Sequence, residues 1–138
     1  MWNDELHVEA DVTQAAVWAR CVDVATWPDW NPGLEKVELE GAFTAGQNGV
    51  IFRAGAGEIP FSLLSVVDGE SFVVESPMDG GIVHRIGCQV TALPGGGSRM
   101  THKVELDGPG SDELAAAIGS ELSKNLSTVA EALIKAAS

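Results

Sequence analysis

The 138-residue chain has no tyrosine, only two cysteines and few basic side chains. Eight Lys and Arg residues stand against 20 Asp and Glu residues, which gives a formal net charge of −12. This balance argues against binding to nucleic acid, whose affinity comes mainly from basic contacts to phosphates, and against anionic membrane surfaces. Cys21 and Cys88 are too few for a disulfide framework and have no zinc-site spacing, so we expect two buried, reduced thiols.

Long apolar runs and the familiar catalytic motifs are also missing. No run is long enough to cross a bilayer, and Met1 to Glu5 lack the positive charge of a signal peptide. We therefore expect a cytoplasmic protein without membrane insertion. GxGxxG, GxxxxGK[ST], HExxH and GxSxG do not occur. Because the three histidines are isolated in the sequence, we expect no metal and no cofactor.

The length predicts one domain over residues 1–138, in either a monomer or a dimer. Apolar alternation predicts a first strand around Leu6 to Ala10, and a helix over Gln14–Val22 follows it, capped by Asp11 or Thr13. A second helical turn is expected near residues 23–25. Two prolines between Trp27 and Gly33 predict an ordered turn or loop there. Six more strands are predicted at Leu34–Glu40, Val50–Ala54, Ile59–Val67, Ser71–Ser76, Gly81–Leu93 and Ser98–Leu106.

The last element is predicted to be one long helix over residues 111–136, capped by Ser111 or Asp112. It carries a single apolar stripe at steps of three and four: Leu114, Ile118, Leu122, Leu126, Val129 and Leu133. Strands followed by a helix indicate an antiparallel α+β fold. Asp68-Gly69 is expected to form a type I′ hairpin turn. Gly119 favours either close approach of the helix to the sheet or a void for a ligand.

Two histidines are the main candidates for chemistry. Matching the apolar faces of the last two strands pairs Cys88 with His102 and His84 with Leu106. Both imidazoles then point inward, about 13 Å apart along the strands, which is too far for a catalytic dyad. Each histidine either hydrogen-bonds within the core or lines a pocket and contacts a ligand. For His102 we expect a partner in the cavity, or the side chain of Asn125.

Three other side chains have two possible roles each. Trp27 and Trp30 either seal the edge of the sheet or border the mouth of a cavity. Arg53 is a solvated charge if it faces outward and an anchor for a ligand carboxylate or enolate if it faces inward. The candidate catalytic residues are Arg53, His84 and His102, and the sequence does not specify a reaction for them.

Trp18, the segment Trp27-Pro28-Asp29-Trp30-Asn31-Pro32 and the segment from Thr101 to Pro109 before the last helix resemble the START-like SRPBCC superfamily. The similarity is to its polyketide cyclase/dehydrase-type branch. It implies a helix-grip fold, in which a curved seven-stranded antiparallel sheet wraps around the long C-terminal helix, with two short helices after strand 1. It also implies binding of lipids, polyketides or similar molecules, and in a minority of members cyclisation or dehydration. Family cyclases use a pocket Arg and Tyr; this chain has no tyrosine, and Ile59–Val67 has no arginine.

The alternation of apolar residues predicts which side chains line a cavity between the sheet and the C-terminal helix. The predicted ligand-binding residues are Trp27, Trp30, Phe52, Phe61, Leu63, Phe72, His84, Ile86, His102, Leu106, Ile118 and Leu122. The expected function is binding of a small hydrophobic molecule in that cavity. A cyclase or dehydrase acting on such a molecule is the first alternative, and an acidic protein-interaction module is the second.

Overall fold

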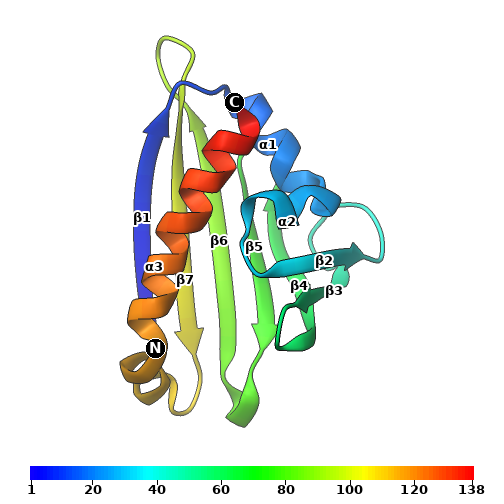
Figure 1. Ribbon diagram of the computed structural model, residues 1–138, viewed down its shortest axis with the longest axis vertical. Coiled ribbons are helices and arrows are strands. Elements are labelled where there is room, and N and C mark those ends of the chain that lie inside the picture. The colour runs from blue at the N-terminus through cyan, green and yellow to red at the C-terminus, as the bar shows by residue number, and fades with distance from the viewer.

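One curved antiparallel sheet forms the body of the protein, and a long helix crosses its concave side (Figure 1). The computed structural model describes all residues, 1–138. In space the strands run in the order β1-β7-β6-β5-β4-β3-β2, so β1 and β2 form the two edges. The strands are β1 (Trp2–Ala10), β2 (Leu34–Leu39), β3 (Asn48–Arg53), β4 (Gly57–Val67), β5 (Ser71–Pro77), β6 (Val83–Ala92) and β7 (Ser98–Asp107).

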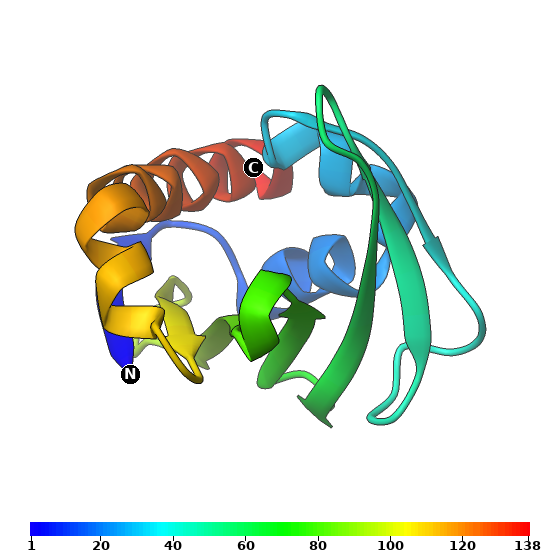
Figure 2. The ribbon, with the colours of Figure 1, turned by 90° about the horizontal axis from the view of Figure 1, so that it is seen from below.

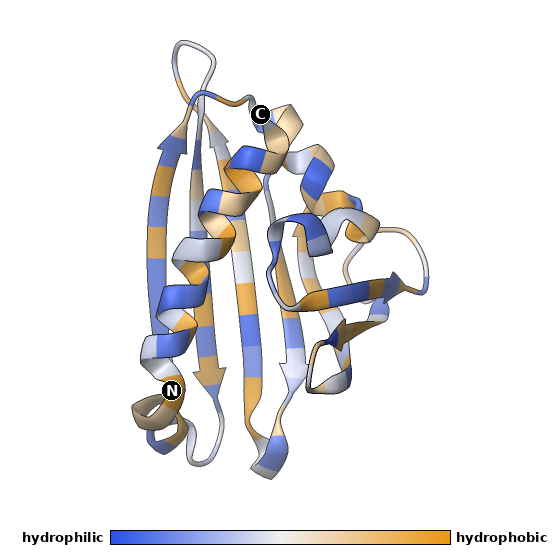
Figure 3. Cartoon of the chain, in the orientation of Figure 1, coloured by the Kyte–Doolittle hydropathy of each residue, from blue (hydrophilic) through white to orange (hydrophobic).

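Two short helices and the long one lie on the same side of the sheet (Figure 2). The chain forms α1 (Gln14–Val22), the 3-10 turn η1 (Val24–Thr26), α2 (Trp27–Trp30), the 3-10 turn η2 (Asp79–Gly81) and α3 (Ser111–Ala137). Apolar and polar positions alternate along the strands, as expected for a sheet with one buried face (Figure 3). The predicted helix-grip architecture is therefore confirmed.

The helix starts differ in part from the sequence-based expectation. The Thr13 hydroxyl accepts a hydrogen bond from the Ala16 amide at 3.1 Å and caps α1, one of the two predicted caps. At α3 the N-cap is Gly110, which has a φ of +77° and no capping side chain, so the prediction of a Ser111 or Asp112 cap is wrong. Asp112 instead lies 3.3 Å from the N-terminal amine.

Two loop predictions are also wrong. Trp27 to Trp30 form a helical turn, because Pro28 lies in its first turn, where backbone amides need no partner within the helix. The β4–β5 turn is not type I′, which would need positive φ at both Asp68 and Gly69. Only Gly69 has positive φ, and Val67 pairs with Ser71 across a three-residue connection.

The predicted pairing of β6 with β7 is confirmed residue by residue. Cys88 lies opposite His102, and His84 lies opposite Leu106. The two imidazoles are therefore on neighbouring strands, four residues apart in register, and do not form a dyad. One-residue slippage would have turned both toward solvent, so this register decides what they can contact.

The interior is packed in one part and hollow in another. An aromatic cluster fills the region beneath α1 and α2, with ring centroids 5.4 to 6.3 Å apart; its members are Trp18, Trp27, Trp30, Phe43, Phe61 and Phe72. At the first half of α3, a Cβ on Gly119 would lie 3.2 Å from the indole of Trp2. Gly119 therefore lets the helix approach β1 closely and does not open a void.

Candidate functional site

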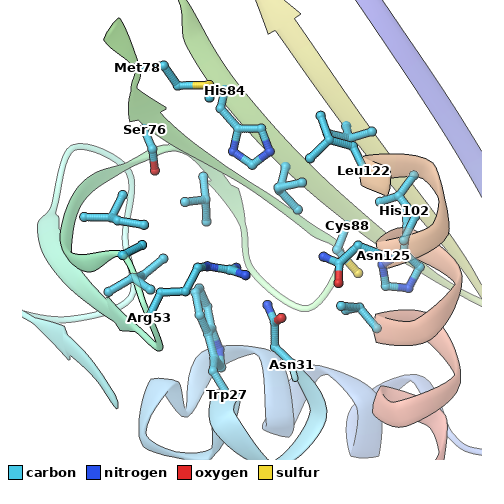
Figure 4. A pocket seen from close by; sticks show the side chains of 18 of the residues that line it. Trp27, Asn31, Arg53, Ser76, Met78, His84, Cys88, His102, Leu122 and Asn125 are labelled. Atoms are coloured by element: carbon cyan, nitrogen blue, oxygen red, sulfur yellow. The ribbon is translucent and has the colours of Figure 1, made fainter. Parts of the chain in front are cut away.

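A cavity of about 700 Å³ lies between the concave face of the sheet and α3 (Figure 4). This volume is within the range of sites that hold small molecules. Side chains from β3 to β7, α2, η2 and α3 form its wall. They are Trp27, Trp30, Asn31, Ile51, Arg53, Ala56, Ile59, Phe72, Val74, Ser76, Pro77, Met78, Asp79, His84, Ile86, Cys88, His102, Val104, Glu121, Leu122, Asn125, Leu126, Val129 and Leu133.

The exposed members of this wall mark the mouth of the cavity. Ala56 lies in the β3–β4 turn, Pro77 ends β5, Asp79 lies in η2, and Glu121 lies on α3. Trp27 lies across the cavity from Met78 (Figure 4). Trp27 and Trp30 are buried, so they border the cavity from within and do not form its mouth.

Several residues predicted from the sequence come together in the wall and others do not. Those that line the cavity are Trp27, Trp30, Phe72, His84, Ile86, His102 and Leu122. The prediction is wrong for five others, which lie outside the lining: Phe52, Phe61, Leu63, Leu106 and Ile118. Whether the lining residues bind a ligand stays a prediction.

On β3, Arg53 and not Phe52 faces the cavity, so the second of the two possible roles of Arg53 places it correctly. Ile51 and Arg53 line the cavity, whereas Phe52 lies on the other face of the strand. There the Lys36 amine lies over the Phe52 ring, 5.4 Å from the ring centroid. On a short strand with apolar residues at successive positions, alternation does not say which face is inward. The register shift between Leu34 and Lys36 on the neighbouring strand adds a local irregularity that the sequence does not reveal.

The other four misplaced residues are packed or turned away from the cavity. Phe61 belongs to the aromatic cluster, with its ring 6.1 Å from that of Trp27. Leu63 and Leu106 are fully buried in contact with other side chains, and Ile118 is half-buried on α3. An inward direction is therefore not enough to place a residue at a cavity, because neighbouring rings decide where space remains.

Some wall residues were missed although the sequence carried a signal for them. Val74 and Ser76 follow Phe72 at steps of two on β5, which places them on the same face. Leu126, Val129 and Leu133 continue the stripe of Leu122 on α3. No sequence signal singled out Asn31, which follows α2 and faces the same space (Figure 4).

Buried polar atoms without a hydrogen-bond partner all belong to the wall of this cavity. They are Nε1 of Trp30, Oδ1 of Asn31, Nε2 of His84 and Nε2 of His102. Leaving such an atom unpaired costs about 1–3 kcal/mol, so folded proteins rarely do so without a water or ligand to fill the site. The expected Asn125 partner of His102 is not bonded to it, although both side chains line the cavity.

Burial keeps both histidines uncharged at neutral pH. Desolvation lowers the pKa of His102 from its usual 6.5 to about 4. The pKa of His84 also falls to about 4, first because of burial and second because of the nearby Arg53 charge. A neutral imidazole has one donor and one acceptor nitrogen, so each histidine can exchange hydrogen bonds with a polar group of a ligand.

The remaining reactive groups restrict the chemistry of the site. A hydrogen bond with the Cys21 thiol and burial raise the pKa of Cys88, which disfavours the nucleophilic thiolate. Both cysteines are free and buried, as predicted. No group of three or more His, Cys, Asp or Glu side chains is arranged to hold a metal ion. The cavity can therefore enclose an apolar body, donate and accept hydrogen bonds, and present the positive charge of Arg53.

Comparison with known proteins places the chain in a family. Residues 1–133 match the family described as polyketide cyclase/dehydrase and lipid transport. The chain belongs to this family. The resemblance to the SRPBCC superfamily that its tryptophan and proline segments suggested is thereby confirmed. A search of curated protein sequences finds no match to this chain.

Solved structures with the same fold differ widely from this family member in sequence. Norcoclaurine synthase from Thalictrum flavum, in complex with dopamine and hydroxybenzaldehyde, has a TM-score of 0.73 at 15% identity, covering 97% of this chain and 84% of that one. The Zhui aromatase/cyclase from Streptomyces sp. R1128 has a TM-score of 0.73 at 15% identity, covering 99% and 93%. Ara h 8.0201 has a TM-score of 0.68 at 15% identity, covering 97% and 98%.

These likenesses establish the fold alone. No helix in this family member combines the length and the apolar character needed to span a membrane.

Proposed function

We propose that this protein binds a small, largely hydrophobic molecule in the cavity between the sheet and α3. The observation that carries the proposal is the convergence of the unpartnered buried polar atoms on one hollow, mainly apolar space. A molecule with a few hydrogen-bonding groups on an apolar body would satisfy these atoms and fill the volume. The family, and the small molecules bound to the structurally similar norcoclaurine synthase, support the same conclusion.

Native mass spectrometry tests the proposal on protein purified from its source organism. We expect an added mass that corresponds to one bound small molecule per chain. Titration with N-phenyl-1-naphthylamine, a neutral apolar dye that fluoresces when removed from water, gives a second readout with a known probe. We expect saturable binding at one site.

A matched pair of variants connects the signal to the cavity. Leu122→Trp adds bulk to the α3 wall of the cavity, whereas Leu64→Trp adds the same bulk at a position that is 51% exposed. We expect Leu122→Trp to lose both the added mass and the dye signal, and Leu64→Trp to keep both. If neither signal appears in the wild-type protein, or if both variants behave alike, the cavity is not a binding site.

Cyclisation or dehydration of the bound molecule is the second candidate. It is favoured by the presence of a cation, Arg53, and two neutral imidazoles, His84 and His102, around one space. A neutral imidazole can accept a proton from carbon while a nearby cation stabilises the resulting enolate. Mass and NMR analysis of the released molecule before and after prolonged incubation separates the two candidates. Dehydration removes one water, cyclisation alters the NMR spectrum even where the mass is unchanged, and binding alone changes neither.

A further inference from the structure

Arg53 is the one arginine of this chain that has no ion pair. Arg20, Arg85 and Arg99 each lie within 4 Å of at least one carboxylate, Arg85 within reach of three. Arg53 has no such partner although the chain carries 20 acidic residues. Its side chain extends instead into the cavity, toward the space shared with Asn31 and His84 (Figure 4).

The surroundings of Arg53 supply no built-in counter-ion. The carboxylates among the wall residues are Asp79 and Glu121, both exposed at the mouth, and neither forms an ion pair with Arg53. The nearby groups that face the same space are neutral hydrogen-bonding ones: the Asn31 amide, the Ser76 hydroxyl and the imidazole of His84. A guanidinium in an apolar cavity among neutral polar groups strongly favours binding of an anionic group whose oxygens accept its hydrogen bonds.

We propose that the ligand of this cavity is an amphipathic acid, an inference that rests on the proposed function. Its anionic oxygen group is bound by Arg53, and its apolar body is held between the sheet and α3. The guanidinium forms a bidentate pair with a carboxylate or an equivalent oxyanion, and Asn31 and His84 are placed to complete its hydrogen bonds. His102 and Asn125 lie on the α3 side of the same space and take up a second polar group of the ligand (Figure 4).

The positions of the polar groups in the cavity wall further limit the class of ligand. Arg53 comes from β3, whereas His102 comes from β7, and three strands of the sheet lie between them. Apolar side chains, including Phe72, Val74 and Ile86, separate the two polar regions. A ligand that reaches both therefore has polar groups at its two ends and an apolar middle, as in a hydroxylated or oxo-substituted carboxylic acid.

Two dyes with the same fused-ring body provide the test. 8-Anilinonaphthalene-1-sulfonate carries an anionic oxygen group, and N-phenyl-1-naphthylamine lacks it. Dissociation constants of both dyes are measured by fluorescence titration on the wild-type protein, Arg53→Met, Arg53→Lys and Arg99→Gln. Arg99 lies outside the cavity on β7, so Arg99→Gln lowers the net charge of the protein by the same amount as Arg53→Met without changing the site.

We expect Arg53→Met to weaken binding of the sulfonate dye by about tenfold or more, which corresponds to the loss of one charge-assisted contact. Binding of the neutral dye should change by less than about twofold. Arg53→Lys should keep part of the sulfonate affinity, because a lysine retains the charge without the bidentate geometry. Arg99→Gln should leave both dissociation constants unchanged.

The outcomes separate the two proposals. If Arg53→Met and Arg99→Gln affect the sulfonate dye equally, Arg53 is not an anion anchor and the inference is wrong, while binding of the neutral dye still supports the proposed function. If neither dye binds the wild-type protein, both proposals fail. If Arg53→Met weakens both dyes equally, Arg53 shapes the cavity without selecting for charge, and the inference is again overturned.

Discussion

At the residue scale, His102 shows how burial creates a demand for a ligand. The side chain is 2% exposed on β7, its backbone belongs to the sheet, and its Nε2 has no hydrogen-bond partner. Its neighbours on the same face, Met100 and Val104, offer no acceptor, and Cys88 lies opposite it. A polar atom in this position lowers the stability of the empty protein and raises the affinity for a molecule that satisfies it.

We therefore predict opposite effects of His102→Leu on stability and on binding. The free energy of unfolding of the ligand-free variant should be unchanged or higher by up to about 1–3 kcal/mol, because an unsatisfied buried group is removed. The share of protein that retains the co-purified molecule should fall. Chemical denaturation and native mass spectrometry measure the two effects.

Met100→Leu is the matched control for His102→Leu, since Met100 is fully buried on the same strand but does not line the cavity. It should keep the bound molecule. A His102→Leu variant that is destabilised and yet binds as wild type would show that the imidazole is structural.

At the element scale, α3 is divided into a part that touches the sheet and a part that covers the cavity. Near its start, Gly119 is buried against the indole of Trp2 on β1. Further along, Leu122, Asn125 and Val129 face the cavity. The close contact at Gly119 sets how far the helix stands from β1 at that point.

Gly119→Val should accordingly destabilise the protein by about 1–3 kcal/mol, the usual cost of overpacking, even though valine has a better helix propensity than glycine. Ala117→Val provides the control, because Ala117 is exposed on the same helix and experiences only the propensity effect. Thermal or urea unfolding measures both. If Gly119→Val is as stable as the wild-type protein or more stable, the Trp2 contact does not restrict the helix position.

At the scale of the whole molecule, the two buried histidines connect the cavity to pH. In the folded state the pKa values of His84 and His102 are about 4, against a usual value of 6.5. Between these values the unfolded chain takes up protons that the folded chain does not. The free energy of unfolding therefore falls as the pH falls from about 6.5 to about 4, by up to about 1.4 kcal/mol per pH unit for each histidine.

This pH dependence is measured by urea unfolding of the ligand-free protein at about pH 7, 6 and 5. We expect the wild-type protein to lose stability over this range, and His102→Leu to lose less. Replacing His84 by leucine as well should flatten the profile further. A profile that is the same in wild type and in the double variant would show that neither imidazole is held neutral by the fold.

The amino-acid sequence by itself determined the fold, because the spacing of apolar residues along the chain has the period of a strand or of a helix in each element. Alternation over the strands, the single apolar stripe of α3 and the glycine-rich turn at residues 94–97 specify the element order. They also set the β6–β7 register that pairs Cys88 with His102. The sequence likewise indicated that His84 and His102 face inward and that they do not form a dyad.

Only the tertiary structure decided which inward positions face a hollow and which are packed. Phe61 and the rings around it fill one part of the interior, whereas the wall near Arg53 and His84 stays open. The face that Arg53 occupies depends on the local register of β3, and the placement of Asn31 depends on how α2 packs against β2 and α3. A cavity is a property of how side chains from distant elements fill space, and no periodicity within one segment encodes it.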